Sequence, residues 1–265
     1  MRILALDFDG VLCNSSREVF VVAVDAYALQ EPGSPLLRRL TELRDDAADG
    51  GNDHLDEPLV QAFADLLPLG NRAEDFGVTL RALETGVAIG DQDAYDRFYA
   101  RHEQAWLESY HRLFYEARER LRADDLSAWL HLHLPYPDLA ETLRGHTADT
   151  KLAVATAKDS RSVNLLLEEL GMADVFGADL ILDKETGVEK THHLRVLRDR
   201  LDADFSDITF VDDKVNHLEQ VARLGVRPIL AGWGFNTQRE HTLARSQGYE
   251  IAFLSTADAV LFKGD

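Results

Sequence analysis

The sequence predicts an α/β fold: a parallel β-sheet, covered by helices on both faces, that is interrupted by a long helical insertion. Two observations support this prediction. Short apolar runs that end in a polar residue recur along the chain, and helical patterns separate them. The first such run, Arg2–Leu6, is followed by about 120 residues of helical periodicity. Such a stretch is too long for an ordinary connection within a sheet, so it predicts an inserted domain.

The predicted strands share one pattern, an apolar segment whose carboxyl end delivers polar residues. Runs of this kind are typical of strands buried on both faces. Because ligands of parallel α/β sheets bind beyond the carboxyl ends of the strands, the polar residues there are the candidates for a functional site. The clearest strands are Arg2–Leu6, Leu152–Thr156 and Ile208–Asp212, and weaker ones are Leu180–Leu182, Arg227–Leu230 and Ile251–Leu254.

Helices are predicted between these strands in the C-terminal half of the chain. Gly171 follows the predicted helix Ser160–Leu170, and Gly225 follows the predicted helix Val215–Leu224. Glycine is favoured just after a helix because the backbone there is often left-handed. Strands that alternate with helices of this length indicate a parallel sheet with helices on both faces. The predicted helices are Ser160–Leu170, Thr191–Leu201, Val215–Leu224 and Thr237–Gln247.

The insertion is predicted to be all-helical. Its clearest pattern runs from Asp93 to Arg122, where an aromatic stripe favours a packed helix interface over a substrate pocket, with His102 as a hydrogen-bonded core residue. The acidic stretch 45–53 is predicted to be a solvated loop. Pro135 and Pro137 mark the end of the insertion. The predicted domains are therefore a core of residues 1–15 and 136–265 and a helical domain of residues 16–135, which we expect to act as a lid.

The amino-acid composition of the chain argues against some classes of binding partner. The chain has 47 acidic and 28 basic residues, a formal net charge of −19. This balance argues against nucleic acid and against an anionic membrane surface, since both need clustered cations. The single cysteine excludes an internal disulfide, and no apolar run approaches the roughly 20 residues of a membrane span. The N-terminal segment does not have the pattern of a signal peptide. We therefore expect a soluble cytoplasmic protein.

A pair of carboxylates follows the first strand. Asp7 and Asp9 are two residues apart, and Gly10 permits the tight turn that directs both at one site. In such a pair one carboxylate suits a nucleophile or metal ligand and the other a proton donor. The alternative is an ordinary acidic turn.

The other strand ends supply complementary groups. Asp212 and Asp213 end the third clear strand and suit an oxygen site for Mg²⁺. Thr156 ends another strand and offers a hydroxyl to an anion, and Lys190 opens a predicted helix where its ammonium suits a phosphoryl group. Together these residues favour a catalytic site over an acidic turn.

On these residues the chain resembles the haloacid dehalogenase-like (HAD) hydrolase superfamily. Asp7-Phe8-Asp9-Gly10-Val11 matches the first motif, Leu152–Thr156 the second, Lys190 the third and Val211-Asp212-Asp213 the fourth. The resemblance covers the core and implies a Rossmann-like parallel sheet. The helical insertion after the first motif is similar to a C1-type cap in position and helicity.

The resemblance implies a Mg²⁺-dependent phosphatase that acts on a small phosphorylated metabolite through an aspartyl-phosphate. It assigns Asp7 as nucleophile and Asp9 as acid and base. It also assigns metal binding to the Asp7 carboxylate, the Asp9 backbone carbonyl and Asp212, with Asp213 binding directly or through water. Mg²⁺ is also expected on electrostatic grounds, because an anionic nucleophile must approach a dianionic substrate.

Some positions depart from the family pattern. Ala157 stands where the family often has Asn, and Thr191 where it often has Pro. Lys184 is a rival of Lys190 for the third motif. Lys158 is a weaker rival, which we expect to be solvated near the start of the following helix.

Two alternatives to the phosphatase remain open at the level of sequence. The first is a phosphosugar mutase of the same superfamily, since the wording of the first motif also occurs in that branch. The second is a non-catalytic ligand-binding member. Such a member is expected to have lost Asp7 or Asp212, and both are present.

Overall fold

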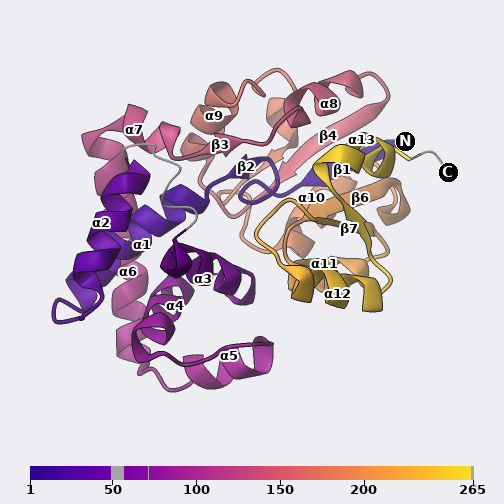
Figure 1. Cartoon of the computed structure of the whole chain (residues 1–265). Helices are drawn as coiled ribbons and strands as arrows, with labels where there is room; N and C mark the ends of the chain where they lie inside the picture. Colours follow the sequence, from indigo (N-terminus) through magenta and orange to yellow (C-terminus); the bar gives the residue numbers. More distant parts are fainter. Residues whose placement is uncertain (49–56, 71, 264–265) are drawn as a thin grey trace. The chain divides into compact units, whose positions relative to one another are not determined.

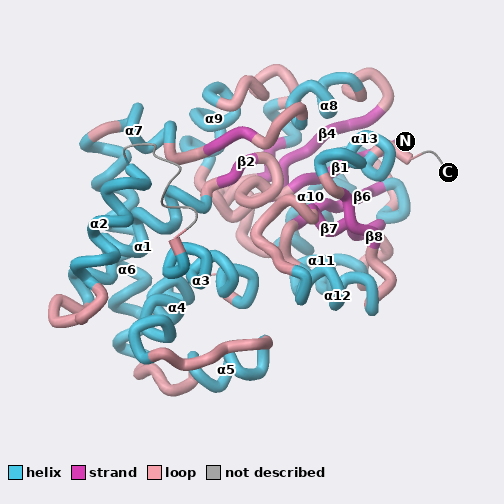
Figure 2. Tube along the Cα trace, in the orientation of Figure 1, coloured by secondary structure: helices cyan, strands magenta, loops and turns pink. Residues whose placement is uncertain are grey.

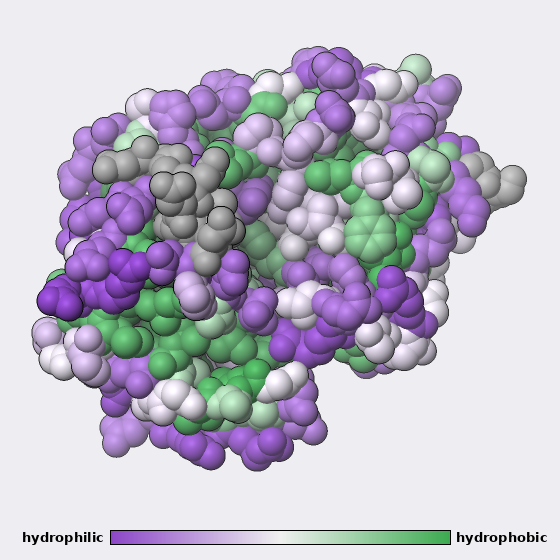
Figure 3. All heavy atoms as spheres, viewed as in Figure 1, coloured by the Kyte–Doolittle hydropathy of each residue, from purple (hydrophilic) through white to green (hydrophobic). Residues whose placement is uncertain are grey.

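The computed structural model describes residues 1–48, 57–70 and 72–263, and the chain divides into two compact units. The core unit comprises Met1–Asn14 and Leu134–Asp265, and the helical unit comprises Ser15–His133. The strands lie in the core unit and the helical unit contains only helices among its described residues (Figures 1 and 2). On the face in Figure 3, hydrophilic residues predominate and hydrophobic ones gather around α3 and α4.

A six-stranded parallel sheet forms the centre of the core unit, in the order β5-β4-β1-β6-β7-β8. The α/β fold class is therefore confirmed, and all six strands were predicted. β1 lies in the middle, so its carboxyl end is flanked by those of β4 and β6. The strands are β1 (Arg2–Leu6), β4 (Thr150–Ala155), β5 (Ile181–Leu182), β6 (Ile208–Asp212), β7 (Arg227–Ala231) and β8 (Glu250–Ala252).

Helices cover this sheet on both faces. Figure 1 shows α10, α11 and α12 on one side of the strands and α8 and α13 on the other. The first group buries a continuous apolar cluster against the sheet, including Leu194, Leu218 and Phe210. Gly171 and Gly225 have positive φ angles, as predicted for helix ends. The helices are α8 (Leu139–Gly145), α9 (Ser160–Glu169), α10 (Lys190–Leu201), α11 (Val215–Ala222), α12 (Gln238–Ser246) and α13 (Ala257–Leu261).

A short antiparallel pair of strands lies where the chain leaves the core unit and where it returns to it. β2 (Cys13–Asn14) pairs with β3 (Leu134–Pro135), so the segment that leaves the core unit lies beside the segment that re-enters it. This pairing lies within one or two residues of the domain boundaries predicted from sequence. The role of the helical unit as a lid stays a prediction.

The helical unit has an apolar core cluster of its own, which includes Val78, Tyr95 and Leu107. Its described helices are α1 (Ser16–Gln30), α2 (Leu37–Ala48), α3 (Pro58–Leu66), α4 (Ala73–Thr85), α5 (Gln92–Tyr99), α6 (Gln104–Asp124) and α7 (Leu126–His131). Among the described residues, no helix of the chain is both long and apolar enough to span a membrane.

The predicted continuous pattern from Asp93 to Arg122 was wrong in one respect, because the chain breaks between α5 and α6. The break spans residues 100–103, yet aromatic contacts continue across it, with ring centroids 5.1 Å apart for Phe98 and His102 and 5.0 Å apart for His102 and Trp106. His102 lies in this break, and its Nδ1 bonds the carbonyls of Phe98 and Tyr99 at 3.1 and 3.2 Å, as expected for a structural histidine.

The predicted acidic loop 45–53 was also wrong in part. Residues 45–48 form the last turn of α2, and the rest of the stretch lies outside the described residues.

Candidate active site

The carboxyl ends of β1, β4 and β6 bring the predicted site residues to one edge of the core sheet. The register aligns Leu6 with Val154 on one side and with Val211 on the other. The sheet pairing continues one residue beyond β1, where the N–H of Asp7 donates to Val211 O at 2.9 Å. Asp7 therefore begins its loop at a fixed position relative to both neighbouring strands.

Asp7 is buried at the centre of this edge, with its side chain 12% exposed. Its Oδ1 accepts a bond from the N–H of Phe8 at 2.7 Å and lies 2.6 Å from Lys190 Nζ. Burial raises the pKa of the Asp7 carboxyl and Asp212 adds to this effect, whereas Lys190 acts in the opposite direction. A second cation at this carboxylate would therefore favour its ionised form.

Lys190 is the lysine that the fold brings to Asp7. It is the first residue of α10, its side chain is 5% exposed, and its Nζ also donates to Ala155 O at 2.9 Å. Burial alone would lower the pKa of Lys190, but the charges of Asp7 and Asp212 outweigh it and raise the pKa. The rival Lys184 is exposed, and the assignment of Lys190 to the third motif stays a prediction.

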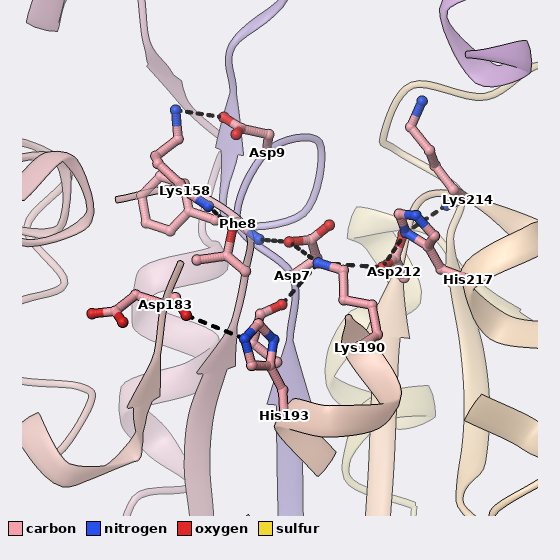
Figure 4. A network of polar contacts seen from close by, with 12 residues as sticks. Asp7, Phe8, Asp9, Lys158, Asp183, Lys190, His193, Asp212, Lys214 and His217 are labelled. Carbon is pink, nitrogen blue, oxygen red and sulfur yellow. Dashed lines mark hydrogen bonds and ion pairs between the residues drawn. The ribbon is translucent and has the colours of Figure 1, made fainter. Parts of the chain in front are cut away.

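Asp212 is the last residue of β6 and is fully buried. Its Oδ1 accepts from the Lys214 N–H at 2.9 Å, its Oδ2 lies 3.8 Å from Lys190 Nζ, and His217 Nδ1 lies 3.0 Å from Oδ2 (Figure 4). Burial opposes the ionisation of Asp212, but His217 and Lys190 outweigh it and lower its pKa to about 2. Asp212 is therefore a carboxylate at neutral pH.

Asp213 faces a different set of groups from Asp212. Its Oδ2 accepts from the Phe235 N–H at 2.9 Å, in the loop after β7. Its carboxylate also packs against Gly10, which has a φ of +78° and where a Cβ would overlap Asp213. Burial raises the pKa of Asp213 well above its usual range. Its part in metal binding stays a prediction.

Asp9 is the more open of the two carboxylates after β1. Its side chain is 37% exposed, and its Oδ1 lies 3.2 Å from Lys158 Nζ. Figure 4 shows Asp9 turned toward Lys158. The expectation that Lys158 is solvated was wrong, because its side chain is only 6% exposed. The lysine folds back over the Phe8 ring, 5.9 Å from its centroid, which brings the ammonium to Asp9.

Thr156 directly follows β4 and is buried. Its N–H donates to Leu182 O at 2.8 Å and is therefore committed to the sheet. Its Oγ1 accepts from the Lys158 N–H at 3.2 Å, which leaves the hydroxyl hydrogen as the donor that Thr156 can offer to an anion.

With this geometry in place, comparisons with known proteins place the chain in a family. The family model of haloacid dehalogenase-like hydrolases matches residues 1–225. The chain belongs to this family of hydrolases. No curated protein matches the sequence.

Solved structures share the fold of this HAD-like hydrolase across nearly the whole chain. Two are of proteins predicted to be phosphoglycolate phosphatases. The one from Haemophilus somnus is 16% identical, covers 100% of this chain and 98% of its own, and has a TM-score of 0.63. The one from Lactobacillus delbrueckii subsp. bulgaricus is 17% identical, with 98% of each chain covered and a TM-score of 0.68. A HAD-like hydrolase from Streptococcus pneumoniae is 12% identical, with 100% and 99% covered and a TM-score of 0.64.

Hydrolases of this family generally use a divalent metal, and the donor groups of this member fit one. Asp7, Asp212 and His217 each offer a ligand atom, and these atoms all lie within 4.8 Å of one another. Two of the three are buried carboxylates, which are hard oxygen ligands suited to Mg²⁺.

The sequence patterns gave no role to His217 and predicted the wrong surroundings for Lys158, although a signal existed for each residue. Lys158 lies two residues after Thr156, within the same strand-end loop. His217 lies five residues after Asp212, in the first turn of the helix that begins directly beyond the strand. A residue in that turn stays close to the strand end, so its imidazole can reach back to the carboxylate.

Proposed function

We propose that the chain is a Mg²⁺-dependent phosphomonoester hydrolase that acts on a small phosphorylated metabolite. The observation that carries this proposal is the environment of Asp7. A buried carboxylate at the end of the central strand has one oxygen held by the Lys190 ammonium and the Phe8 N–H. A carboxylate fixed in this way is oriented for attack before the substrate binds.

Asp7 is the nucleophile of this proposal. Because both contacts go to Oδ1, we assign the attack to Oδ2, which forms a bond to phosphorus while the ester P–O bond breaks. The product is an aspartyl-phosphate, in which the carboxylate is a leaving group good enough for later hydrolysis. Water then attacks the phosphorus, releases phosphate and regenerates Asp7.

Asp9 is the acid and base of this proposal. It gives its proton to the leaving alkoxide in the first step and removes a proton from the attacking water in the second. Its greater exposure suits a group that exchanges protons with substrate and water. The Lys158 ammonium, 3.2 Å from Asp9 Oδ1, helps to hold the Asp9 side chain in place.

Thr156 and Lys190 bind the phosphoryl oxygens in this proposal. The Thr156 hydroxyl donates one hydrogen bond, and the Lys190 ammonium lies close to both Asp7 and Asp212. Mg²⁺, held by Asp7 and Asp212 with Asp9 and Asp213 as further predicted ligands, would neutralise charge on the substrate. These groups together offset the repulsion between a carboxylate nucleophile and a phosphate dianion.

The test is a phosphatase assay with Mg²⁺ over phosphoglycolate, sugar phosphates and nucleotides. Phosphoglycolate comes first because two structurally similar proteins are predicted to hydrolyse it. The reaction is quenched with acid during turnover, and peptides are mapped by mass spectrometry. We expect phosphate release from at least one substrate and one phosphoryl group on the peptide that contains Asp7. Turnover with a phosphoryl group on any other residue would contradict the assignment.

A further inference from the structure

His217 is a residue of the strand-end cluster that the four sequence motifs do not contain. It lies in the first turn of α11, which starts three residues after the end of β6. Its Nδ1–H donates to both oxygens of the Asp212 carboxylate, at 3.2 Å to Oδ1 and 3.0 Å to Oδ2 (Figure 4). The imidazole is therefore held against a carboxylate that is itself a predicted metal ligand.

The same imidazole completes a three-residue group of metal-binding donors. Ligand atoms of Asp7, Asp212 and His217 all lie within 4.8 Å of one another, and each comes from an element that ends or begins at the edge of the sheet. The group has two oxygen donors and one nitrogen donor. Imidazole is a good ligand for most first-row transition metals and is also accepted by Mn²⁺, the weakest binder among them, whereas Mg²⁺ favours oxygen ligands alone.

The spacing of these atoms suits metal binding as well as a hydrogen bond. Two ligand atoms at adjacent corners of an octahedron, each about 2.1 Å from the ion, lie about 3.0 Å apart. His217 Nδ1 and Asp212 Oδ2 are 3.0 Å apart. A metal ion bridging them thus requires loss of the Nδ1 proton and little other change between these two atoms.

From this juxtaposition we propose that His217 is a nitrogen ligand of the divalent cation. The mixed donor set makes the site bind Mn²⁺ and similar transition-metal ions more tightly than Mg²⁺. On binding, the Nδ1 lone pair goes to the metal, and the Nδ1 proton moves to Nε2 or to the solvent. This inference rests on the proposed function only in that both need a metal site at Asp7 and Asp212.

The test uses Mn²⁺ as a spectroscopic probe in the full-length protein, stripped of metal. Pulsed electron paramagnetic resonance of the Mn²⁺-loaded protein reports a ¹⁴N hyperfine coupling when an imidazole nitrogen is bonded directly to the ion. We expect this coupling in the wild type, and we expect it to change when histidine is labelled with ¹⁵N. It should be lost in His217→Gln and kept in His192→Gln, a matched control at an exposed histidine.

Calorimetric titration gives a second readout and does not depend on activity. His217→Gln should weaken Mn²⁺ binding by at least about tenfold while changing Mg²⁺ binding much less. His217→Asp, which restores an all-oxygen donor set, should shift the preference toward Mg²⁺. Circular dichroism of each variant checks that it is folded.

The outcomes separate this inference from the proposed function. Tight Mn²⁺ binding without a directly bonded nitrogen would overturn the role of His217 and leave the Mg²⁺-dependent hydrolase intact. Binding of neither Mn²⁺ nor Mg²⁺, with Asp7→Asn and wild type alike, would overturn both the inference and the metal dependence of the proposed function.

Discussion

Glu18 of the helical unit and Asp7 of the core unit are both buried carboxylates with a cationic partner, yet their surroundings differ. Glu18 is fully buried, and Arg118 bonds both of its oxygens, with Nε at 2.6 Å and Nη2 at 2.8 Å. The indole N–H of Trp129 adds a third bond at 3.3 Å. Arg118 and Trp129 are both donors from the same unit, which is the pattern of a structural ion pair.

At Asp7, hydrogen-bond donors contact one of the two carboxylate oxygens, and a second negatively charged side chain lies nearby. Lys190 and the Phe8 N–H bond Oδ1, while the Asp212 carboxylate lies in the same cluster. The helical unit therefore satisfies Glu18 with protein donors, whereas the core unit places the carboxylates of Asp7 and Asp212 close together beside one lysine. Burial of a charge alone does not distinguish the two cases. The number of neighbouring groups and the sign of their charge distinguish the two cases. They predict that Glu18 contributes to stability and Asp7 to chemistry.

The largest effect is expected at Asp7. Asp7→Asn removes the attacking charge at nearly constant volume, so phosphatase turnover should fall by about 10⁴-fold or more. The free energy of unfolding should change little, because the repulsion from Asp212 is relieved as the bond to Lys190 weakens. Phosphate release and chemical denaturation measure the two quantities. Wild-type turnover in a folded Asp7→Asn protein would remove the nucleophile from the mechanism. The matched control is Asp174→Asn, an exposed carboxylate of the same unit.

A smaller and leaving-group-dependent effect is expected at Asp9. Asp9→Asn removes the proton donor, which is typically worth about 10²–10⁴-fold. The loss should be large for alkyl phosphates, whose alkoxide needs a proton, and much smaller for p-nitrophenyl phosphate in the first step. Single-turnover rates with both substrates measure the difference. An equal loss with the two leaving groups would take the acid role away from Asp9.

The structural half of the comparison is tested at Arg118. Arg118→Met leaves Glu18 buried without its cation and should lower the free energy of unfolding by about 3–5 kcal/mol. Its control lies on the same helix, where Arg112 pairs with Glu116 in an exposed i,i+4 contact at 3.0 Å. Arg112→Met should cost about 0.5 kcal/mol or less. Urea denaturation of the two variants compares them, and similar losses would mean that the Glu18 pair is not structurally special.

The sequence predicted the position of the site because that position follows from short-range pattern. Asp7, Asp212 and Lys190 each stand at the boundary of a strand or helix, and the parallel order of β4, β1 and β6 brings those boundaries together. The positions of these boundaries needed no information beyond apolar runs and their polar ends. The site of the insertion followed from the long helical periodicity after the first strand, whereas the order of the strands was not predicted.

What could not be predicted depends on the direction of side chains and on distant partners. Asp212 and Asp213 are adjacent, and the side chains of successive residues at a strand end point to opposite sides. Asp212 therefore contacts His217, whereas Asp213 contacts Phe235, which lies 22 residues further along the chain. Lys158 was misjudged because its long side chain reaches back across Phe8, which composition does not encode. These details fix the roles of the carboxylates.

The smallest effect is expected at His193, which shows that a buried titratable group in the core unit can also be structural. Its Nε2–H donates to Gly187 O at 2.9 Å and Asp183 O at 3.2 Å, and its buried Nδ1 has no hydrogen-bond partner among the described residues. Burial lowers the pKa of His193 to about 4, and the charges of Lys190 and His192 add to the effect.

The sign of the pH dependence follows from this lowered pKa. The unfolded chain binds a proton at His193 below about pH 6.5, whereas the folded protein does so only near pH 4. Stability from this residue is therefore full above pH 6.5 and is lost as the pH falls toward 4, by up to about 3 kcal/mol. His193→Gln should flatten the decline of the unfolding free energy between pH 6.5 and 4, and His192→Gln should not. If the wild-type slope persists in His193→Gln, the folded protein binds a proton at His193 as readily as the unfolded chain does. His193 would then not be a buried neutral group.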